Sequence, residues 1–573
     1  MSCVGCECLD RSVTPDEILQ SLDEAQRRAA MEFGAPVLIR AGAGSGKTRT
    51  VTSRIAYGIA TGELDARHCL AVTFTTRAAG ELRSRLGAMG VPPVAARTFH
   101  SAALRQLRFF WPQVTQTTAP QLVSDVQSLV VDAAREFGLR LNAEAARHVT
   151  THIGWAKSHA IGPDQFVHEC ERILRIPPRG MDNYQVARIY GEYERIKAQH
   201  NQMDFDDVLS LLLAIFIDFP DAASQVRKQY RHITVDEFQD VSSLQFNLLR
   251  QWLGPRGDLC AVGDAAQSIY GFAGADPHYI LSFAEFFPRA TVIDLEQTYR
   301  CASEIVALSR RVGDANSIML KSSQERAGVV TEAVFADALD EAQHVAASIA
   351  ALIESGTHPT EIAILARQSD QLPAIAEALK MLGIAVVQRG MSDFFQRREV
   401  KYALLQLRVA LANEPESSLI DAVTRVVSDL GWAEAVEDMA EANQATWDSY
   451  SVLLRLATTM HADDPTATIA DLLAEINVRV ESVNMPAPAA VSVMTMHAAK
   501  GLEWDTVFIV GLIDGLMPHV SAIGLQAQSE ESRLLYVAVT RARTNVNLSW
   551  FRRVGETGAI CQRSPLLPQL AAV

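Results

Sequence analysis

The sequence contains no apolar run long enough to cross a membrane. The longest obvious run, residues 211–217, falls far short of the roughly 20 residues that a membrane-spanning helix needs. The first residues include Cys, Asp and Glu, where a signal peptide would carry a basic start and an apolar stretch. These absences argue against a membrane-spanning helical protein and predict a cytoplasmic one that has no membrane partner.

Cysteine is scarce and scattered, with eight residues in a chain of 573. This number and spacing do not make the framework of a small disulfide-rich secreted protein. Cys3, Cys6 and Cys8 crowd together near the N-terminus. A structural zinc site needs four ligands, and no fourth candidate lies within reach in the sequence. We therefore expect residues 1–20 to be a flexible tail, with metal binding by the three cysteines as the alternative.

Positive charge is also in deficit. The sequence has 52 Lys and Arg residues against 67 Asp and Glu residues, and the net charge is −15. This balance argues against a bulk electrostatic binder of nucleic acid, such as an architectural protein. A narrow local track of basic residues remains compatible with it, because net charge describes the whole surface and not one groove.

Two series of short β-rich segments alternate with helical patterns, which is typical of parallel α/β sheets. In the first series the predicted strands are residues 37–40, 69–74, 233–236, 259–262 and 291–295. In the second series they are residues 329–335, 361–366, 385–388, 491–495, 506–510 and 546–550. A long segment rich in Ala, Leu, Arg and Glu interrupts each series. The predicted fold is α/β, with two parallel-sheet domains that each carry a mainly helical insertion.

The domain boundaries follow from these interruptions. We predict a first α/β domain at residues 21–99 and 201–295, its insertion at 100–200, a second α/β domain at 296–395 and 488–552, its insertion at 396–487, and a tail at 553–573.

The strand predicted at residues 37–40 runs into a glycine-rich loop, Ala41-Gly-Ala-Gly-Ser-Gly-Lys-Thr48, and then into a helical pattern. Small residues let backbone N–H groups curl around phosphate oxygens, and the start of the helix adds the positive end of its dipole. Lys47 is predicted to reach the β- and γ-phosphates of a nucleotide, and Thr48 to bind Mg²⁺. Ala41 stands where the strict pattern has Gly, a change that a small residue tolerates. The predicted phosphate loop consists of Ala41, Gly42, Ala43, Gly44, Ser45, Gly46, Lys47 and Thr48.

An acidic segment, Ile233-Thr-Val-Asp-Glu-Phe-Gln-Asp240, is predicted to supply the second half of the nucleotide site. Its apolar residues lead to Asp236 and Glu237 at the end of a predicted strand, where ligands of such sheets collect. Asp236 suits a Mg²⁺ ligand, and Glu237 suits the base that orients and deprotonates the attacking water. An Asp-Glu pair alone is more often a solvated turn, but behind a buried strand, in a chain with a phosphate loop, the catalytic interpretation is favoured.

Further segments accompany these two in a fixed order. They are Leu22-Asp-Glu-Ala-Gln26, Val72-Thr-Phe-Thr-Thr-Arg-Ala-Ala79, Arg97-Thr-Phe-His-Ser101, Val262-Gly-Asp-Ala-Ala-Gln-Ser-Ile-Tyr-Gly-Phe-Ala-Gly-Ala275, Leu295-Glu-Gln-Thr-Tyr-Arg300, Thr495-Met-His-Ala-Ala-Lys-Gly-Leu-Glu-Trp504 and Arg533-Leu-Leu-Tyr-Val-Ala-Val-Thr-Arg-Ala-Arg543. In this order they resemble the motifs of UvrD/PcrA/Rep-type DNA helicases of superfamily one. The resemblance covers residues 22–543 and implies two RecA-like domains with ATP at their interface.

The resemblance assigns roles around the nucleotide. Gln26 would read the adenine edge, Tyr299 would stack on the base with Arg49 beside it, and Glu503 would reach the ribose. The remaining catalytic candidates are Gln267, Arg300 and Arg541, which accompany Lys47 and Glu237. The two arginines would stabilise the charge that spreads over the transferring phosphoryl group, and Gln267 would report the γ-phosphate to the DNA track.

The resemblance also assigns a single-stranded DNA path, in which bases stack on aromatic faces and basic groups contact the backbone. The candidates are Phe74, Tyr270 and Phe272 for stacking, and His100, His497 and Lys500 near the DNA backbone.

This chain departs from the family pattern in three places. Phe272 and Ala273 stand where motif III usually has Trp and Arg, Thr76 replaces an Asn, and the insertion at 396–487 is shorter than its counterpart in UvrD or PcrA. These changes predict a weaker grip on DNA and less efficient unwinding, with the ATPase intact. The chain resembles the motor of a shorter UvrD-like branch, without the HRDC module that follows motif VI in that branch.

The predicted function, which the resemblance implies, is that of an ATP-dependent DNA helicase and translocase that moves 3′→5′ on single-stranded DNA and unwinds duplex DNA, in DNA repair or recombination. Its partners would be Mg²⁺ with ATP, single-stranded and tailed duplex DNA, and repair or accessory proteins. One alternative is a translocase that strips proteins from DNA with little unwinding. The other is a non-enzymatic scaffold, which the intact catalytic candidates disfavour. No nuclease segment is visible, which disfavours a RecB-like nuclease-helicase.

Overall fold

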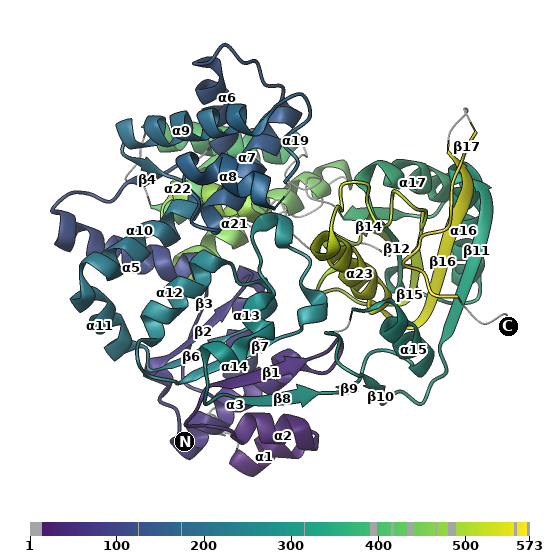
Figure 1. Cartoon of the computed structure of the whole chain (residues 1–573), viewed down its shortest axis with the longest axis horizontal. Coiled ribbons are helices and arrows are strands. Elements are labelled where there is room, and N and C mark those ends of the chain that lie inside the picture. Colours follow the sequence, from purple (N-terminus) through teal and green to yellow (C-terminus); the bar gives the residue numbers. More distant parts are fainter. Residues whose placement is uncertain are drawn as a thin grey trace, which may run out of the picture.

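The computed structural model describes residues 14–569 apart from short gaps, and it shows two α/β domains with parallel sheets (Figure 1), as predicted. The gaps are residues 124, 174, 315, 390–397, 414–417, 433–440, 464, 466, 480–488 and 555–557. Cys3, Cys6 and Cys8 lie outside the described residues. Within the described part of the chain, no helix combines the length and the apolar character needed to cross a bilayer.

The first sheet has six parallel strands in the order β3-β2-β6-β7-β1-β8. They are β1 (Val37–Ala41), β2 (Cys69–Thr73), β3 (Ala95–Thr98), β6 (His232–Val235), β7 (Leu259–Gly263) and β8 (Thr291–Leu295). Strands β2 and β7 are buried along their whole length, as expected for strands covered on both faces. Because all six strands run the same way, the residues that follow them collect at one edge of the sheet.

The helices of the first domain pack on both faces of this sheet. They are α1 (Pro15–Gln20), α2 (Glu24–Met31), α3 (Lys47–Thr61), α4 (Thr76–Ala88), α5 (Phe99–Thr115), α10 (Phe205–Asp218), α11 (Pro220–Gln229), α12 (Ser243–Leu253), α13 (His278–Leu281) and α14 (Phe283–Phe286).

Two of these helices lie in segments that the sequence placed elsewhere. We predicted that the first insertion begins at residue 100, but Leu107 and Phe110 of α5 are buried in the core of the first domain. We also assigned residues 1–20 to a flexible tail, but residues 15–20 form α1. A capping box between Thr14 and Glu17 starts this helix, and Ile18 is buried against the domain.

The second sheet has the parallel order β11-β16-β15-β12-β14-β13, with β17 antiparallel to β16. Its strands are β11 (Val329–Asp337), β12 (Ile362–Ala366), β13 (Val386–Arg389), β14 (Val491–Thr495), β15 (Trp504–Ile509), β16 (Ala542–Val554) and β17 (Ala559–Ile560). Its helices are α15 (Ser303–Val312), α16 (Ala338–Glu354), α17 (Leu372–Met381) and α23 (Leu525–Val539). Part of the predicted tail at 553–573 belongs to this domain, because Leu567 is buried in its core.

The two insertions are helical, and each has a core of its own. The first contains α6 (Val126–Arg135), α7 (Ala143–Ser158), α8 (Pro163–Arg172) and α9 (Asn183–Gln199), and it leaves the domain through the paired strands β4 (Gln121–Leu122) and β5 (Gln202–Met203). The second contains α19 (Arg398–Asn413), α20 (Leu419–Asp429), α21 (Glu441–Asp463) and α22 (Ile469–Arg479).

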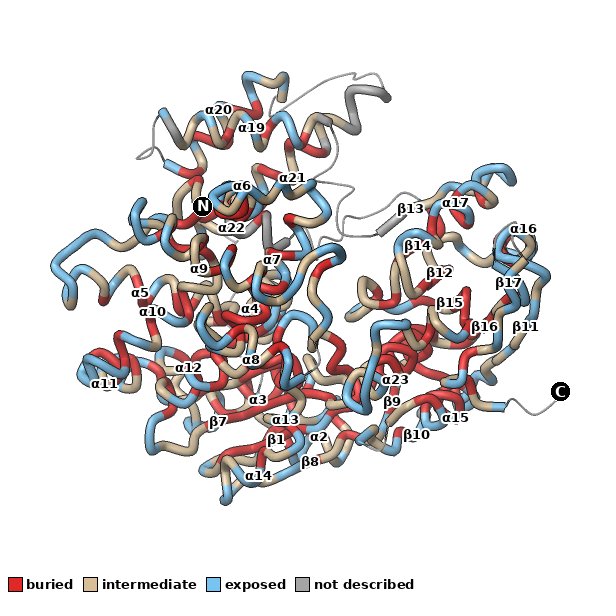
Figure 2. Tube along the Cα trace, turned by 45° about the horizontal axis from the view of Figure 1, so that its top comes forward, coloured by how far each residue is buried: buried red, intermediate tan, exposed pale blue. Residues whose placement is uncertain are grey.

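Figures 1 and 2 show the two insertions side by side above the first α/β domain. The second insertion therefore contacts the domain that it does not interrupt. Arg108 of α5 forms an ion pair with the buried Asp471 of α22, and Arg408 Nη1 lies 3.8 Å from Asp125 Oδ2 at the start of α6. In Figure 2 the cores of both sheets are red, which marks buried residues. Helices α11 and α16 lie at the surface and are among the more exposed helices.

Candidate functional site

The phosphate loop joins the carboxyl end of β1 to α3. Gly44 and Gly46 have φ values of 72° and 80°, a left-handed conformation that glycine adopts without steric cost. Gly46 is the N-cap of α3, so no side chain lies between the first N–H groups of the helix and a ligand. A Cβ atom on Gly44 would lie 2.5 Å from Cβ of Arg300, which shows how closely the start of the second domain approaches the loop.

The ammonium of Lys47 is buried and makes no hydrogen bond with the described residues. Its ion-pair partner is Glu237, whose Oε2 lies 3.6 Å away, beyond normal hydrogen-bond distance. A buried ammonium without acceptors is costly, because it has lost the water that would solvate it. Phosphate oxygens held by the loop would supply these acceptors, so the environment of Lys47 fits an anionic phosphate ligand.

Asp236 and Glu237 follow β6 at the same edge of the sheet. Glu237 has a φ of 53°, which is uncommon for a residue with a side chain and concentrates at functional sites. Its backbone N–H donates to Asp236 Oδ1 at 3.0 Å, and Gln239 Nε2 donates to Glu237 Oε2 at 2.6 Å. Gln239 therefore fixes the Glu237 carboxylate, and the Glu237 backbone N–H fixes the carboxylate of Asp236.

The two carboxyl groups differ in their electrostatic surroundings. Burial, helped by the charge of Glu237, raises the pKa of Asp236 above its usual value, although Lys47 opposes the shift. Burial acts in the same direction on Glu237, but Lys47 and Lys500 outweigh it and hold the pKa of Glu237 below its usual value. Glu237 is thus firmly ionised, and a divalent cation beside Asp236 would favour ionisation of the second carboxyl group.

Two arginines of the second domain converge on this place. Arg300 Nη1 donates to the Thr540 carbonyl at 3.3 Å, and Arg541 Nε donates to the Val537 carbonyl at 2.9 Å. Burial and the neighbouring charge of Arg300 lower the pKa of Arg541 to about 10, which leaves it charged at neutral pH. Attraction to Glu237 of the first domain opposes that shift, so Arg541 lies close enough to act across the domain boundary.

The segment before α15 contacts the phosphate loop directly. Thr298 Oγ1 donates to the Ala43 carbonyl at 2.8 Å, and the Tyr299 N–H donates to the Gly44 carbonyl at 2.9 Å. These bonds fix the position of Arg300, the next residue, relative to the loop. The sequence indicated Tyr299 and Arg300 but not Thr298.

The predicted adenine contacts lie on the other side of the loop. Gln26 is fully buried, and its amide is used inside the protein: Nε2 donates to the Ser45 carbonyl at 2.9 Å, and Oε1 accepts the Asp23 N–H at 3.2 Å. In this arrangement Gln26 supports the phosphate loop and offers no free edge to a base. Tyr299 is partly exposed, and its hydroxyl donates to Asp23 Oδ2 at 2.7 Å.

Arg49 and Glu503, the other predicted nucleoside contacts, also have partners in the protein. The exposed Arg49 donates to the Ser21 carbonyl. Glu503 lies 2.5 Å from Arg300 and 3.0 Å from Arg543, measured between side-chain nitrogen and oxygen atoms. A ribose contact by Glu503 would therefore share this carboxylate with two arginines.

A chain of polar contacts leads from the nucleotide site toward the second domain. Gln267 Nε2 donates to Asp264 Oδ2 at 2.7 Å, and the Gln267 carbonyl accepts from Lys500 Nζ at 2.8 Å. Lys500 also pairs with Asp240 of the acidic segment, and its ammonium lies 4.7 Å from the ring centroid of Tyr270. Only 9% of the Lys500 side chain is exposed, so in this arrangement it bridges the domains and presents no free donor to a DNA backbone.

Four of the predicted DNA contacts form a row of rings, here called the aromatic row. Phe74 stacks on Tyr270 at 5.6 Å and 5°, Tyr270 meets Phe272 edge-on at 6.1 Å, and Phe272 meets His497 edge-on at 5.9 Å. Phe74 and Phe272 are 43% and 44% exposed, so two members of the row present aromatic surface to the solvent. The row begins on the first domain and ends at His497 on the second.

The two predicted histidines differ in character. Burial, with Arg367 and Lys500 nearby, lowers the pKa of His497 to about 3, so this ring is neutral and could contact DNA only as an uncharged group. His100, at the start of α5, stacks on Phe205 at 4.4 Å and lies outside the aromatic row as defined here.

Sequence reasoning missed several residues that hold the site together. They are Asp23, Gln239, Asp264, Thr298 and Arg543. Gln239 and Asp264 lie within three residues of the ends of predicted strands, so their place in the chain was a usable signal. The partners of Asp23 and Arg543 lie far away in the sequence, and only the fold brings them together.

Comparison with known proteins gives a consistent result. Residues 22–288 match the UvrD/REP helicase N-terminal domain, and residues 293–456 and 437–553 match the UvrD-like helicase C-terminal domain. ATP-dependent DNA helicase UvrD2 of Mycobacterium tuberculosis is 41% identical over 561 residues, which cover 94% of this chain and 80% of that protein. ATP-dependent DNA helicase UvrD1 of the same organism is 29% identical, covering 93% and 82%. The putative ATP-dependent DNA helicase YjcD of Bacillus subtilis is 28% identical, covering 95% and 81%.

Proposed function

Because this chain belongs to the UvrD-like family of ATP-dependent DNA helicases, we propose that it moves 3′→5′ along single-stranded DNA in DNA repair or recombination. One observation carries the proposal. The boundary between the two α/β domains holds both the phosphate loop with its converging arginines and the aromatic row. A change in how the domains meet would therefore act on nucleotide and DNA together.

In the proposed reaction, the phosphate loop binds the triphosphate and Lys47 neutralises its β- and γ-phosphates. Glu237, which neighbouring cations keep ionised, would accept a hydrogen bond from the attacking water, orient it and take its proton as the phosphoryl group transfers. Thr48 and Asp236 would hold Mg²⁺, which would neutralise charge on the phosphates when bound with ATP. Gln267, anchored on Asp264, would sense the γ-phosphate.

Arg300 and Arg541 would stabilise the negative charge that spreads over the transferring phosphoryl group. Both belong to the second domain, whereas Lys47 and Glu237 belong to the first. Hydrolysis would then require the domains to close on each other, and loss of the γ-phosphate would weaken that closure. This alternation is the proposed source of movement.

On the DNA side, we propose that bases stack on Phe74 and Phe272, the exposed members of the aromatic row. Base stacking on aromatic rings contributes about 1–3 kcal/mol per base and tolerates any sequence, as a motor requires. The proposed substrates are single-stranded and tailed duplex DNA, with repair or accessory proteins as further partners. Work on chromosomal DNA would place the protein in the cytoplasm of a bacterium such as those that carry its relatives.

The direction of movement is tested by strand displacement on duplexes with a single-stranded tail. We expect ATP-dependent displacement from a duplex with a 3′ tail and much less from an otherwise identical duplex with a 5′ tail. The Glu237→Gln variant serves as the control for ATP-dependent displacement. Equal displacement from both tails, or a preference for the 5′ tail, would contradict the proposed polarity.

The shorter second insertion and the exposed Ala273, where relatives have a cation, favour a motor that unwinds poorly when it acts alone. We expect such a motor to displace streptavidin from a biotinylated single-strand end efficiently. Under single-turnover conditions, with one motor per tail, it should separate only short duplexes. Robust unwinding of a long duplex under those conditions would show that the short insertion suffices.

A further inference from the structure

The amino-terminal ends of the strands form a second edge of the first sheet. It lies opposite the carboxyl-terminal edge, which carries the phosphate loop. In Figure 1 the arrowheads of β1 and β8 point toward the second α/β domain, so this amino edge faces away from it. Helix α11 leads into β6 and α12 leads toward β7, so the ends of both helices lie here. Residues of α10, α11 and α12 line a surface groove of about 600 Å³ at this place.

The groove combines apolar and cationic side chains. Its lining includes Leu213 and Ile217, one turn apart on α10, and Arg227 and Arg250, near the ends of α11 and α12. Ile217 is 60% exposed, although its side chain would be more stable against an apolar partner. Such a mixture, an apolar floor with a few directed polar groups, is typical of a binding groove.

Five cations lie in or near the helices and loops at this end of the strands. Lys228, Arg231 and Arg256 accompany Arg227 and Arg250, and none of the five forms an ion pair within the described residues. Burial and the neighbouring charges of Arg227 and Arg231 lower the pKa of Arg256, as expected where like charges crowd together. In a chain with a net charge of −15, such a cluster is a local exception.

Part of the cluster has a structural role. Arg227 Nη1 donates to the Gln251 carbonyl at 3.0 Å, and Arg256 Nη2 donates to the Tyr230 carbonyl at 3.1 Å. These bonds satisfy carbonyl groups at or near helix ends, where cations are favoured. Arg250 has no such bond among the described residues and is exposed. Its guanidinium is therefore available to bind a carboxylate in two-point fashion.

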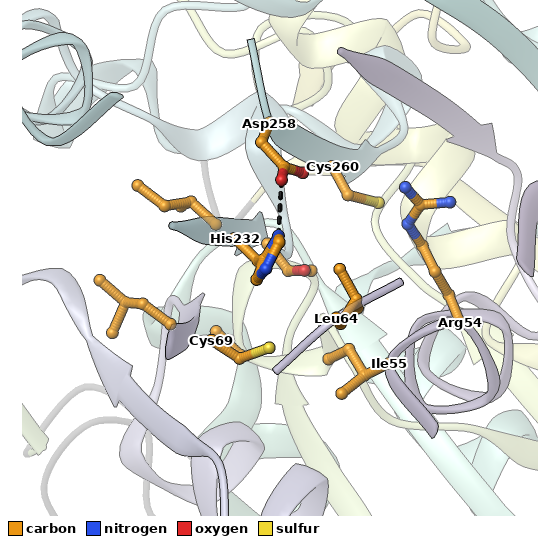
Figure 3. Close-up of a pocket in the computed structure, with 11 residues that line it drawn as sticks. Arg54, Ile55, Leu64, Cys69, His232, Asp258 and Cys260 are labelled. Atoms are coloured by element: carbon orange, nitrogen blue, oxygen red, sulfur yellow. Dashed lines mark hydrogen bonds and ion pairs between the residues drawn. The ribbon is translucent and has the colours of Figure 1, made fainter. Parts of the chain in front are cut away.

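The neighbouring enclosed space cannot serve as the binding site. The cavity in Figure 3 lies between Cys69, Cys260 and the His232–Asp258 pair, whose Nδ1 and Oδ2 atoms are 2.5 Å apart. Its volume of about 10 Å³ has room for no more than a water molecule. Of these two spaces, the groove is the one large enough to receive a side chain.

We propose that this groove docks an acidic peptide segment of a partner protein, with an apolar side chain on Leu213 and Ile217 and carboxylates on Arg250 and Arg227. Nucleic acid fits the groove less well. No aromatic side chain lines it, whereas single strands are held by stacking. The groove also lies at the opposite edge of the sheet from the aromatic row. A partner bound here would leave the nucleotide and DNA sites uncovered.

The test uses fluorescence anisotropy of a labelled short peptide of alternating Asp and Leu, added to the full chain. A peptide with Lys in place of Asp and one with Ser in place of Leu are the controls. We expect binding of the first peptide that weakens with salt, and much weaker binding of both controls. Failure of the Asp-Leu peptide to bind at millimolar concentration would overturn the proposal.

Variants locate the binding. Arg250→Glu and Ile217→Ser should each raise the Kd for the Asp-Leu peptide about tenfold. Arg552→Glu, at an exposed arginine of β16 in the second domain, is the matched control and should bind like the unchanged chain. Circular dichroism would verify the fold of each variant. Binding that is the same in Arg250→Glu and Ile217→Ser would place the peptide elsewhere and contradict the proposal.

The same variants separate this proposal from the motor function. The ATPase rate with single-stranded DNA should be unchanged in Arg250→Glu, because the groove lies away from both substrate sites. If the unchanged chain did not bind the peptide and Arg250→Glu weakened binding to duplex DNA, the groove would be a nucleic-acid site. The proposal would then be wrong.

Discussion

At the scale of single residues, the catalytic proposal rests on side chains whose state makes sense only with a phosphate ligand. Lys47 is buried without a hydrogen-bond acceptor, and Glu237 is ionised and held in a strained backbone conformation. Strain of this kind persists where the surrounding structure enforces it, and it is common at functional sites.

Replacing Glu237 by Gln should separate binding from hydrolysis. The amide keeps the size of the side chain and its contact with Gln239 but cannot accept a proton, so turnover should fall by about 10²-fold or more. ATP binding, measured with a fluorescent analogue, should be retained. Lys47→Ala is the contrasting variant and should lose affinity as well as turnover. Normal turnover in Glu237→Gln would remove Glu237 from its proposed role.

Ala273 offers a gain-of-function test on the DNA side. It is exposed beside Phe272, at the position where the resemblance to motif III leads us to expect an arginine. Ala273→Arg should tighten binding to single-stranded DNA and steepen its dependence on salt by about one unit if one phosphate contact is added. Titrations at several salt concentrations would measure the slope. A slope that stays the same would mean that this position does not face the DNA backbone.

At the scale of elements, most strands could be predicted because buried parallel strands appear as short apolar runs. The runs at 291–295 and 491–495 coincide with β8 and β14, and the other predicted runs overlap strands with shifted ends. Strand β3 was not predicted, since Ala95–Thr98 contains Arg97 between small residues and resembles a loop. Helix α5 was placed in the wrong unit, because its apolar face does not reveal which core it joins.

The candidate site could be predicted as a set of residues but not as a geometry. Motif order named Gln26 and Lys500 as site residues, and the structure gives each of them partners within the protein. Their partners, the Ser45 carbonyl for Gln26 and Asp240 for Lys500, depend on tertiary contacts across 19 and 260 positions of sequence. No local pattern specifies such pairs, so the expected contacts of Gln26 with adenine and of Lys500 with DNA remain predictions.

A buried ionic cluster joins the first insertion to its domain. Lys157 of α7 and Lys197 of α9 both contact Asp204 and Asp207, with Nζ of Lys197 2.8 Å and 2.5 Å from the two carboxylates. The two lysines lower the pKa of Asp204, despite its burial, to well below the usual range. With a folded-state pKa below the unfolded one, the Asp204 carboxylate adds stability above the unfolded pKa of about 3.9, and this stability is lost as the pH falls toward the folded pKa.

Breaking this cluster should destabilise the protein more than removing a surface ion pair. Lys197→Met should lower the free energy of unfolding by about 3 kcal/mol, because it leaves buried carboxylates short of one cation. Urea denaturation at pH 7 would measure the change. The double variant Lys197→Met with Asp207→Asn should recover part of the loss, since it restores the charge balance. A loss below about 1 kcal/mol would mean that water solvates the cluster.

At the scale of the whole molecule, several side chains connect the two α/β domains, among them Thr298, Tyr299 and Lys500. The Lys500 ammonium makes three such contacts, to Asp240 of the acidic segment, the Gln267 carbonyl and the Tyr270 ring. It therefore joins the nucleotide site of the first domain, the aromatic row and the second domain. The second insertion adds a separate link through Asp471 and Arg108.

Removing this ammonium should uncouple the two substrates. Burial already raises the pKa of Asp240 to about 6 against the opposing effect of Lys500. In Lys500→Met the carboxyl group should take up a proton and remain buried without a charge. We expect stimulation of the ATPase by DNA to fall about tenfold or more, while the affinity for single-stranded DNA changes less. Equal stimulation in Lys500→Met and the unchanged chain would show that the bridge does not transmit the DNA signal.

The most direct measurement is the steady-state ATPase rate of the unchanged chain with and without single-stranded DNA, at saturating ATP and Mg²⁺. If nucleotide and DNA share one domain boundary, the rate should be low alone and rise at least about tenfold with DNA, because DNA favours the closed arrangement that brings Arg300 and Arg541 to the phosphates. A rate that is the same with and without DNA would contradict this coupling.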